Sequence, residues 1–223
     1  HGCVMERVSD DTTFLWKSSL LAGQKPKGEA RAVGDLIGRI HAASTDPDFA
    51  PSAFQNRDDF RALRIEPYLT FAAAQHPQAE PQLTALADML YDNAQVLVHG
   101  DVSPKNILIR DSGPVLLDAE CATMGDAAFD PSFCLNHLVL KAVHLPLQRA
   151  ALLDEVGQLW QAYAAHLSWE AADHLEARIC QLLPALMLAR VDGKSPVEYL
   201  DTAAQKKVRA IARSLITAPT TTL

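Results

Sequence analysis

A short segment near the middle of the chain combines residue types that could handle a phosphoryl group. Residues 99–106 read His-Gly-Asp-Val-Ser-Pro-Lys-Asn, and Asp118 follows twelve residues after Asn106. Transfer of a phosphoryl group from a magnesium nucleotide to a hydroxyl needs a carboxylate beside that hydroxyl and oxygen ligands for the metal. The spacing favours Asp101 for the first role. It favours Asn106 and Asp118 for the second, because Mg²⁺ takes a few protein oxygens together with phosphates and water.

Three short apolar runs frame these polar residues. Each has the length expected of a buried strand; the runs cover residues 96–98, 107–109 and 115–117. Residues 111–114 read Asp-Ser-Gly-Pro and predict a turn between the last two runs. A loop between strands then holds Asp101 and Asn106, and a hairpin brings Asp118 beside them. Any one of the three could be an ordinary turn or strand-end residue, but their combined spacing favours a site.

Residues 96–140 resemble the aminoglycoside phosphotransferase and choline kinase-like family, whose members are relatives of protein kinases. The family's catalytic loop resembles HGDVSPKNILI, its metal-binding strand end resembles VLLDAE, and its next segment resembles GDAAFDPSFCLNHL. Further out, CVMERV resembles the hinge strand and LARVDGKSPVEYL resembles a C-terminal segment. The resemblance implies that Asp101 is the catalytic base, that Asn106 and Asp118 bind Mg²⁺, and that ATP is the phosphoryl donor.

The resemblance also implies a small N-terminal lobe with a Gly-rich loop and a lysine that contact the nucleotide phosphates. The sequence has no G-x-G-x-x-G motif, and Gly193-Lys194-Ser195 is not a P-loop, because Leu188 replaces its first glycine. We therefore expect residues 1–10 to be the hinge strand of a small lobe that lies outside this chain. Residues 11–216 would be the large lobe, and residues 217–223 a frayed tail.

Within that lobe we expect the catalytic loop over residues 99–106 and the metal-binding strand over residues 115–120. If the N-terminal segment is the hinge, backbone groups of Met5, Glu6 and Val8 would line the adenine pocket. Side-chain identity carries little information at such positions, so these assignments rest on the resemblance.

Three further residues of the loop have open interpretations. We count His99 among the catalytic-site residues, as a brace of the loop through backbone hydrogen bonds rather than as a proton carrier. Lys105 would either offset charge on the transferred phosphoryl group or be a solvated lysine. Ser103 would either cap the turn or contact phosphate. It stands where many protein kinases have a lysine, which is a departure from their pattern.

Several acidic residues after the loop need separate interpretations. Glu120 would be an additional metal carboxylate if the strand continues past Asp118, because residues i and i+2 of a strand share a face; otherwise it pairs with a nearby base. Asp126 is interpreted as a turn residue, and Asp130, directly before Pro131, as a helix cap.

Three charged residues lie near the C-terminal end of the helical segment expected at residues 169–190. Arg190, Asp192 and Lys194 either face the acceptor pocket or are solvated at the helix end.

The rest of the sequence predicts a mostly helical α+β fold with a small β-hairpin core. Apolar residues recur at helical spacing in eight segments. The segments are 14–21, 30–43, 58–75, 79–94, 133–143, 147–167, 169–190 and 203–216. Pro184 is expected to kink or split the seventh segment. Because the strands are few and clustered, the chemistry should sit on one small β core surrounded by helices.

Composition narrows the class of partner. The chain has 27 acidic and 20 basic residues, for a net charge of −7, which argues against nucleic acid. No apolar stretch reaches transmembrane length, and four scattered cysteines without a C-x-x-C pair favour a reducing compartment. We therefore expect a cytoplasmic enzyme with a small-molecule acceptor and no membrane partner.

Three functions compete. The leading hypothesis is a small-molecule kinase that uses ATP and Mg²⁺. A non-catalytic binding protein is an alternative, although it would have no reason to keep Asp101, Asn106 and Asp118 together. A protein kinase is less favoured, because Asp118-Ala119-Glu120 replaces D-F-G and no A-P-E segment follows. The sequence does not identify the acceptor.

Overall fold

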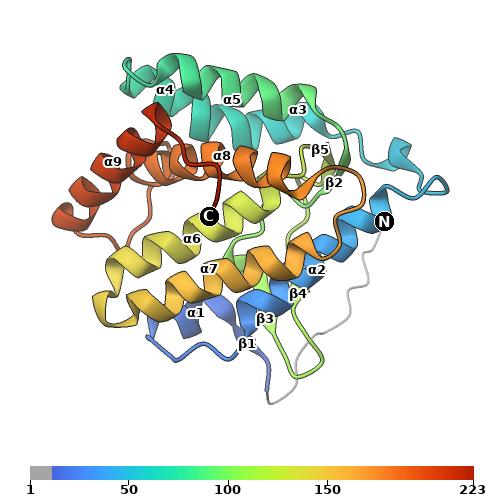
Figure 1. The fold of residues 1–223 in the computed structure, drawn as a ribbon, viewed down its shortest axis with the longest axis horizontal. Helices are drawn as coiled ribbons and strands as arrows, with labels where there is room; N and C mark the ends of the chain where they lie inside the picture. Colours follow the sequence, from blue (N-terminus) through green and yellow to red (C-terminus); the bar gives the residue numbers. More distant parts are fainter. Residues whose placement is uncertain (1–11) are drawn as a thin grey trace, which may run out of the picture.

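The computed structural model describes residues 12–223. The expected hinge strand at residues 1–10, with Met5, Glu6 and Val8, lies outside the described residues. Most of the described chain is helical, and the helices pack around two small antiparallel sheets (Figure 1). The predicted α+β class, mostly helical, is confirmed. The α-helices are α1 (Trp16–Leu21), α2 (Glu29–Ser44), α3 (Arg57–Phe60), α4 (Phe71–Gln75), α5 (Glu80–Asp92), α6 (Phe129–His144), α7 (Arg149–Ala164), α8 (Ala172–Asp192) and α9 (Thr202–Thr217).

The strands form two sheets rather than one hairpin core. One sheet has the order β1-β3-β4, and the other pairs β2 with β5. Their bounds are β1 (Phe14–Leu15), β2 (Val96–Val98), β3 (Ile107–Ile109), β4 (Val115–Leu116) and β5 (Thr123–Gly125). Sequence patterns did not reveal β5, because three residues without an apolar alternation carry no strand signal. It pairs with β2, and Val98 packs closely against Gly125. A side chain at position 125 would not fit there, because its Cβ would lie 2.8 Å from Val98 Cγ2.

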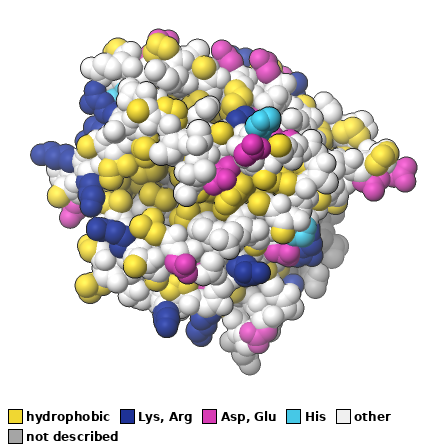
Figure 2. All heavy atoms as spheres, viewed as in Figure 1, with side chains coloured by type: hydrophobic (Ala, Val, Ile, Leu, Met, Phe, Trp, Pro, Cys, Tyr) yellow, Lys and Arg dark blue, Asp and Glu magenta, His cyan; other side chains and the backbone are white. Residues whose placement is uncertain are grey.

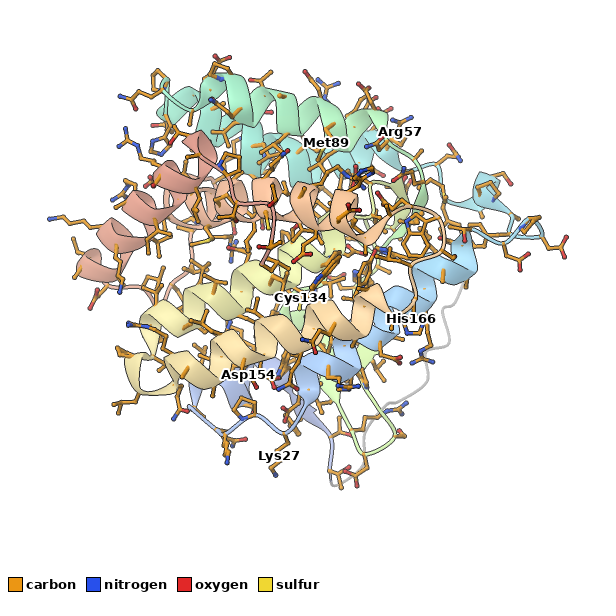
Figure 3. The ribbon with its side chains drawn as sticks, in the orientation of Figure 1. Lys27, Arg57, Met89, Cys134, Asp154 and His166 are labelled. Atoms are coloured by element: carbon orange, nitrogen blue, oxygen red, sulfur yellow. The ribbon has the colours of Figure 1, made fainter. Side chains whose placement is uncertain are left out.

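Helix α2 lies closely against α7. An added Cβ at Gly34 would stand 2.3 Å from the carbonyl oxygen of Leu159, so only glycine permits this backbone approach. At the end of the same contact, His166 Nε2 lies 2.9 Å from Asp35 Oδ1. Figure 3 shows His166 where the end of α7 meets α2. The two helices therefore form one face of a rigid scaffold beside the β strands.

The predicted helix at residues 58–75 has an unusual middle. It runs through α3, then a π-helix, η2 (Arg61–Thr70), and then α4. Pro67 lies inside η2 and has no N–H for an α-helical hydrogen bond, so a wider turn is a reasonable local accommodation. The π-helix matters for function because it carries Arg64, which is buried and faces the catalytic loop.

One of the two outcomes expected at Pro184 is excluded. Pro184 does not split the seventh helical segment, since α8 is one helix over Ala172–Asp192; the expected kink stays a prediction. Pro184 is buried, and tertiary packing can outweigh the lost backbone hydrogen bond. In the tail after α9, which is expected to be frayed, the exposed Leu223 N–H donates to Glu176 Oε1 at 2.9 Å.

Short 3₁₀ turns connect several elements: η1 (Pro51–Ala53), η3 (Pro104–Asn106) and η4 (Pro146–Gln148). On the face drawn in Figure 2, hydrophobic side chains gather across the middle, and several Lys and Arg side chains lie along the left edge and the lower part. Within residues 12–223, no helix combines the length and apolar character needed to cross a membrane.

Candidate active site

The loop that carries Asp101 begins with a glycine that no other residue could easily replace. Strand β2 ends at Val98, and Gly100 turns the chain with φ of 82°. A side chain at Gly100 would also meet Cys121 Cβ at 2.9 Å. Positive φ and lack of space together require glycine here. The turn directs Asp101 back toward the helices, and η3 and β3 follow.

The Asp101 carboxylate is buried and surrounded by donors. Its side chain and backbone together are 5% exposed. Ser103 Oγ donates to Asp101 Oδ1 at 2.8 Å. Two cations approach the other oxygen, Oδ2: Arg64 Nη2 at 3.1 Å and Lys105 Nζ at 3.1 Å. A carboxylate fixed from three directions is well oriented to accept a proton from a bound hydroxyl.

Arg64 contacts the candidate site, and the sequence analysis did not identify it. Besides Asp101, its guanidinium donates to the backbone carbonyl of Gly100 and to that of Leu63. Arg64 therefore ties the π-helix η2 to both the turn and the carboxylate. It stands 37 residues before Asp101, and no motif connects the two positions, so only the tertiary structure identifies it.

Asp130 is a brace of the loop and not the helix cap that we predicted. Its two carboxylate oxygens accept hydrogen bonds from the backbone N–H groups of His99, at 2.6 Å, and Gly100, at 3.0 Å. Helix α6 begins at Phe129 with Ala128 as its N-cap, so Asp130 lies within the first turn. The capping interpretation failed because the helix starts earlier than its apolar periodicity indicates.

Two histidines support this brace. Burial raises the pKa of Asp130, but His41, whose Nε2 lies 3.3 Å from Asp130 Oδ2, and His99 together hold it below its ordinary value. Asp130 is therefore an ionised acceptor at neutral pH. His99 Nδ1 also accepts the backbone N–H of Asp101 at 3.2 Å, which is the backbone contact that our bracing interpretation of His99 requires.

Asp126 has the predicted turn role. Its Oδ1 accepts the Ala128 N–H at 2.7 Å, two residues along the chain. The same carboxylate lies 3.3 Å from Arg178 Nη2 of α8, so it also connects the turn to the helical layer.

Asn106 and Asp118 are brought together by the β3–β4 pairing. The Leu117 N–H donates to the Asn106 carbonyl at 2.8 Å, which places Asn106 beside the residue before Asp118. Asn106 is buried and its amide donates to the Asp101 carbonyl at 3.3 Å. Asp118 is exposed and has φ of 66°, a conformation that a short polar residue tolerates.

This oxygen pair is a suitable donor set for Mg²⁺. Among residues 12–223, no group of three or more His, Cys, Asp or Glu side chains is arranged to hold a metal. Mg²⁺ commonly needs only one or two protein carboxylates, since nucleotide phosphates and water fill its other positions. One amide oxygen and one exposed carboxylate match that requirement.

The argument that placed Glu120 beside Asp118 is wrong. Strand β4 ends at Leu116 instead of continuing to Glu120, and the positive φ of Asp118 breaks the extended geometry. Residues 118 and 120 therefore lose the shared face that a strand would give them. Glu120 is exposed, and the strand geometry on which its metal-binding assignment depended is absent.

The two open loop residues both contact Asp101. Lys105 is not merely solvated, because its side chain is 55% exposed yet its Nζ pairs with the Asp101 carboxylate. The Ser103 hydroxyl donates to that carboxylate, while the turn is closed by backbone groups, from the Asn106 N–H to the Ser103 carbonyl at 2.8 Å.

The three charged residues near the end of α8 separate in space. Asp192 forms an ion pair with Arg209, with Nη2 2.6 Å from Oδ1, and contacts His76. Lys194 Nζ lies 5.7 Å from the centre of the Phe71 ring. Only Arg190 lines a pocket next to the catalytic loop.

Comparison with known proteins supports the family resemblance. The phosphotransferase enzyme family profile matches residues 13–166, which include the catalytic loop and Asp118. The methylthioribose kinase of Erwinia tasmaniensis is 27% identical over 72% of this chain and 48% of its own length. That of Klebsiella pneumoniae strain 342 is 24% identical over 76% of this chain and 51% of its own.

The chain thus spans about half the length of the curated relatives it matches. A solved glucosamine kinase structure is 21% identical and covers 92% of this chain and 54% of its own, with a TM-score of 0.45. The family match extends over most of the chain, from β1 through α7. This protein therefore belongs to the phosphotransferase enzyme family, as its catalytic-loop residues predicted.

Proposed function

We propose that this chain supplies the catalytic lobe of an ATP-dependent kinase that phosphorylates a hydroxyl of a small molecule. The observation that carries the proposal is the placement of the buried Asp101 carboxylate on the same short loop as Asn106, which the β3–β4 pairing joins to Asp118. A base and two metal-ligand oxygens are the protein groups that this reaction needs.

In the proposed reaction, the acceptor hydroxyl oxygen forms a bond to the γ-phosphorus of ATP. The bond from that phosphorus to the β–γ bridging oxygen breaks, and ADP leaves. The hydroxyl proton passes to Asp101, which Ser103 and Arg64 hold in place. Lys105, whose Nζ reaches the same carboxylate, offsets negative charge near the transferred group.

Asn106 and Asp118 would hold Mg²⁺. The metal, when bound, would neutralise charge on the nucleotide phosphates. The described residues contain no Gly-rich phosphate loop, and the curated relatives are about twice as long as the part matched here. We therefore propose that a small lobe of the same protein completes the nucleotide site.

The test is phosphoryl transfer by the full-length protein. Purified enzyme is given Mg-ATP and a panel of small hydroxyl compounds, and ADP release is followed together with the mass of the phosphorylated product. The variant Asp101→Asn is the matched control, because it keeps the shape of the side chain. A product made by the native enzyme and lost in the variant supports the proposal; ADP release without any acceptor product contradicts it.

A further inference from the structure

We propose that the acceptor carries a negatively charged group, most simply a carboxylate, held in a cationic pocket beside the catalytic loop. This inference rests on the proposed kinase function and names its substrate class. The pocket lies among α1, η3, α6 and the segment after α8. Its side chains come from different parts of the sequence, and those that carry the argument are Lys17, Lys105, Lys141, Arg190, Glu198 and Tyr199.

Charge in the cationic pocket is unbalanced. Four basic side chains line it against one acid, Glu198. Lys17 pairs with that acid, with Nζ 2.5 Å from Oε1, and Lys105 pairs with Asp101 outside the pocket lining. Among residues 12–223, the hydrogen-bond acceptors of Arg190 are uncharged: the Tyr68 hydroxyl and atoms of Ser195. The remaining positive charge would attract an anion, and it disfavours a cationic acceptor.

Lys141 contributes the most deeply buried of these positive charges. It is 1% exposed, and its Nζ has no acidic partner among the described residues. Its one hydrogen bond is a long one, 3.5 Å, to the His137 carbonyl, and its charge also lies 5.1 Å from the centre of the Tyr199 ring. A buried ammonium without a counter-charge is costly. Such a cost is understandable at a site that is completed by a ligand.

Two further polar atoms beside Lys141 lack partners. Tyr199 Oη and Arg190 Nε are buried, and neither has a hydrogen-bond partner among residues 12–223. Buried polar atoms are nearly always paired, so unpaired ones need an explanation. Both are donors, as is Lys141 Nζ. Three donors around one small space match the acceptor oxygens of a carboxylate.

The size of the space and its position fit this assignment. The cavity is about 30 Å³, and one water-sized group needs roughly 10–15 Å³ of such space. It can therefore admit about two to three water-sized groups, which is enough for the two oxygens of a carboxylate. Lys105 lines the same pocket and pairs with Asp101 at 3.1 Å, so an anion held there would leave its hydroxyl near the base.

The first experiment measures anion binding without any chemistry. Acetate and inorganic phosphate are titrated into the full-length protein, and binding is followed by NMR or by thermal shift. We expect acetate to bind the native protein, and Lys141→Met to weaken binding at least about tenfold, as expected for loss of a charge-assisted hydrogen bond. Lys207→Met, at an exposed position, is the matched control and should bind normally.

A second variant protects this test against misfolding. Tyr199→Phe removes only the unpartnered hydroxyl, and we expect a smaller loss of acetate binding with an unchanged melting temperature. Acetate that does not bind the native protein, or that binds folded Lys141→Met equally well, overturns the inference. Tighter binding of phosphate than acetate would overturn the assignment of a carboxylate.

The second experiment separates this inference from the proposed function. The acceptor panel contains matched compounds that differ in charge, such as gluconate, glucose and glucosamine, or glycerate and glycerol. We expect the best acceptor to be a carboxylate, with a KM that rises at least about tenfold in Lys141→Met. A neutral or cationic best acceptor overturns the inference and leaves the kinase function standing. Anion binding that depends on Lys141, without phosphorylation of any acceptor, supports the pocket and contradicts the kinase function.

Discussion

The two aspartates of the site lie in opposite environments. Asp101 is buried, and Ser103, Arg64 and Lys105 surround its carboxylate. Asp118 is exposed and has a left-handed backbone conformation. A buried carboxylate is stable only with such partners, whereas an exposed one can rely on water until a metal arrives. The side chain of the proposed base is therefore preorganised by this chain, whereas that of the proposed metal ligand Asp118 is exposed to solvent.

The largest effect should come from the preorganised side. In the full-length enzyme, Asp101→Asn should lower kcat by about two to four orders of magnitude, because the amide cannot act as the base. Nucleotide affinity should stay nearly the same. Turnover and ATP binding are measured on the same preparation, with Asp111→Asn in the exposed turn as control. Unchanged turnover would refute the role of Asp101.

Substitution of the proposed metal ligands should change the Mg²⁺ requirement of the enzyme. Asp118→Ala and Asn106→Ala should each raise the Mg²⁺ concentration needed for half-maximal activity, by about 10–100-fold. Titration of Mg²⁺ against activity measures this, with Glu120→Gln as the control that should behave like the native enzyme. A variant with an unaltered Mg²⁺ requirement would show that its residue has only a structural role.

Arg64 tests whether orientation of the base matters. Arg64→Met should lower kcat about tenfold while the KM for ATP changes little, since the lost contacts position Asp101 and do not touch nucleotide. Arg64→Lys should recover part of kcat if the charge beside Asp101 is the important feature. If Arg64→Met loses kcat only because less of the protein is folded, and Arg64→Lys does not recover activity, Arg64 has only a structural role.

The backbone at Asp118 allows stability and activity to be separated. Asp118→Gly should leave stability unchanged or raise it by up to about 1 kcal/mol, because glycine adopts positive φ without strain. Asp118→Ala should be less stable than Asp118→Gly. Both should lose Mg²⁺-dependent activity. Urea denaturation of the two variants gives the comparison, and a glycine variant that is clearly less stable would contradict it.

Lys141 is buried and has no acidic partner among the described residues, so its contribution to the pH dependence of stability should be opposite to that of a lysine in an ion pair. Burial lowers the pKa of Lys141 to about 8 from 10.5. Between those values the unfolded chain holds a proton that the folded chain has released, so stability rises with pH. The unfolding free energy of the native protein minus that of Lys141→Met should therefore rise from pH 8 to 10.5, as measured by urea denaturation at several pH values. The charged or titratable groups facing Lys141 are Lys17, Cys134, His137, Arg190, Glu198 and Tyr199.

Local sequence was sufficient to predict that the proposed base and the proposed metal ligands lie close together. Asp101, Asn106 and Asp118 lie within one loop and one hairpin, so spacing and short apolar runs placed them together. The supporting groups come from far away. Arg64 reaches the loop from a π-helix, and Asp130 reaches it from α6, and no local pattern links either residue to the loop.

The errors have the same origin. The extension of the strand to Glu120 assumed that extended geometry continues past the apolar run, but β4 ends at Leu116 and Asp118 has a positive φ. The split expected at Pro184 assumed that an isolated helix would break, whereas α8 is buried on several sides. In each case tertiary contacts or a single dihedral outweighed the local preference.

The close contact between Gly100 and Cys121 provides a native reporter of loop motion. Cys121 is buried, and burial raises the pKa of its thiol, so it should react slowly with alkylating reagents while the loop is closed. Its labelling rate would then measure how often the catalytic loop opens locally, on the timescale of seconds to hours. A bound acceptor or nucleotide that stabilises the closed loop should lower the labelling rate of Cys121. The measurement needs no added spectroscopic probe.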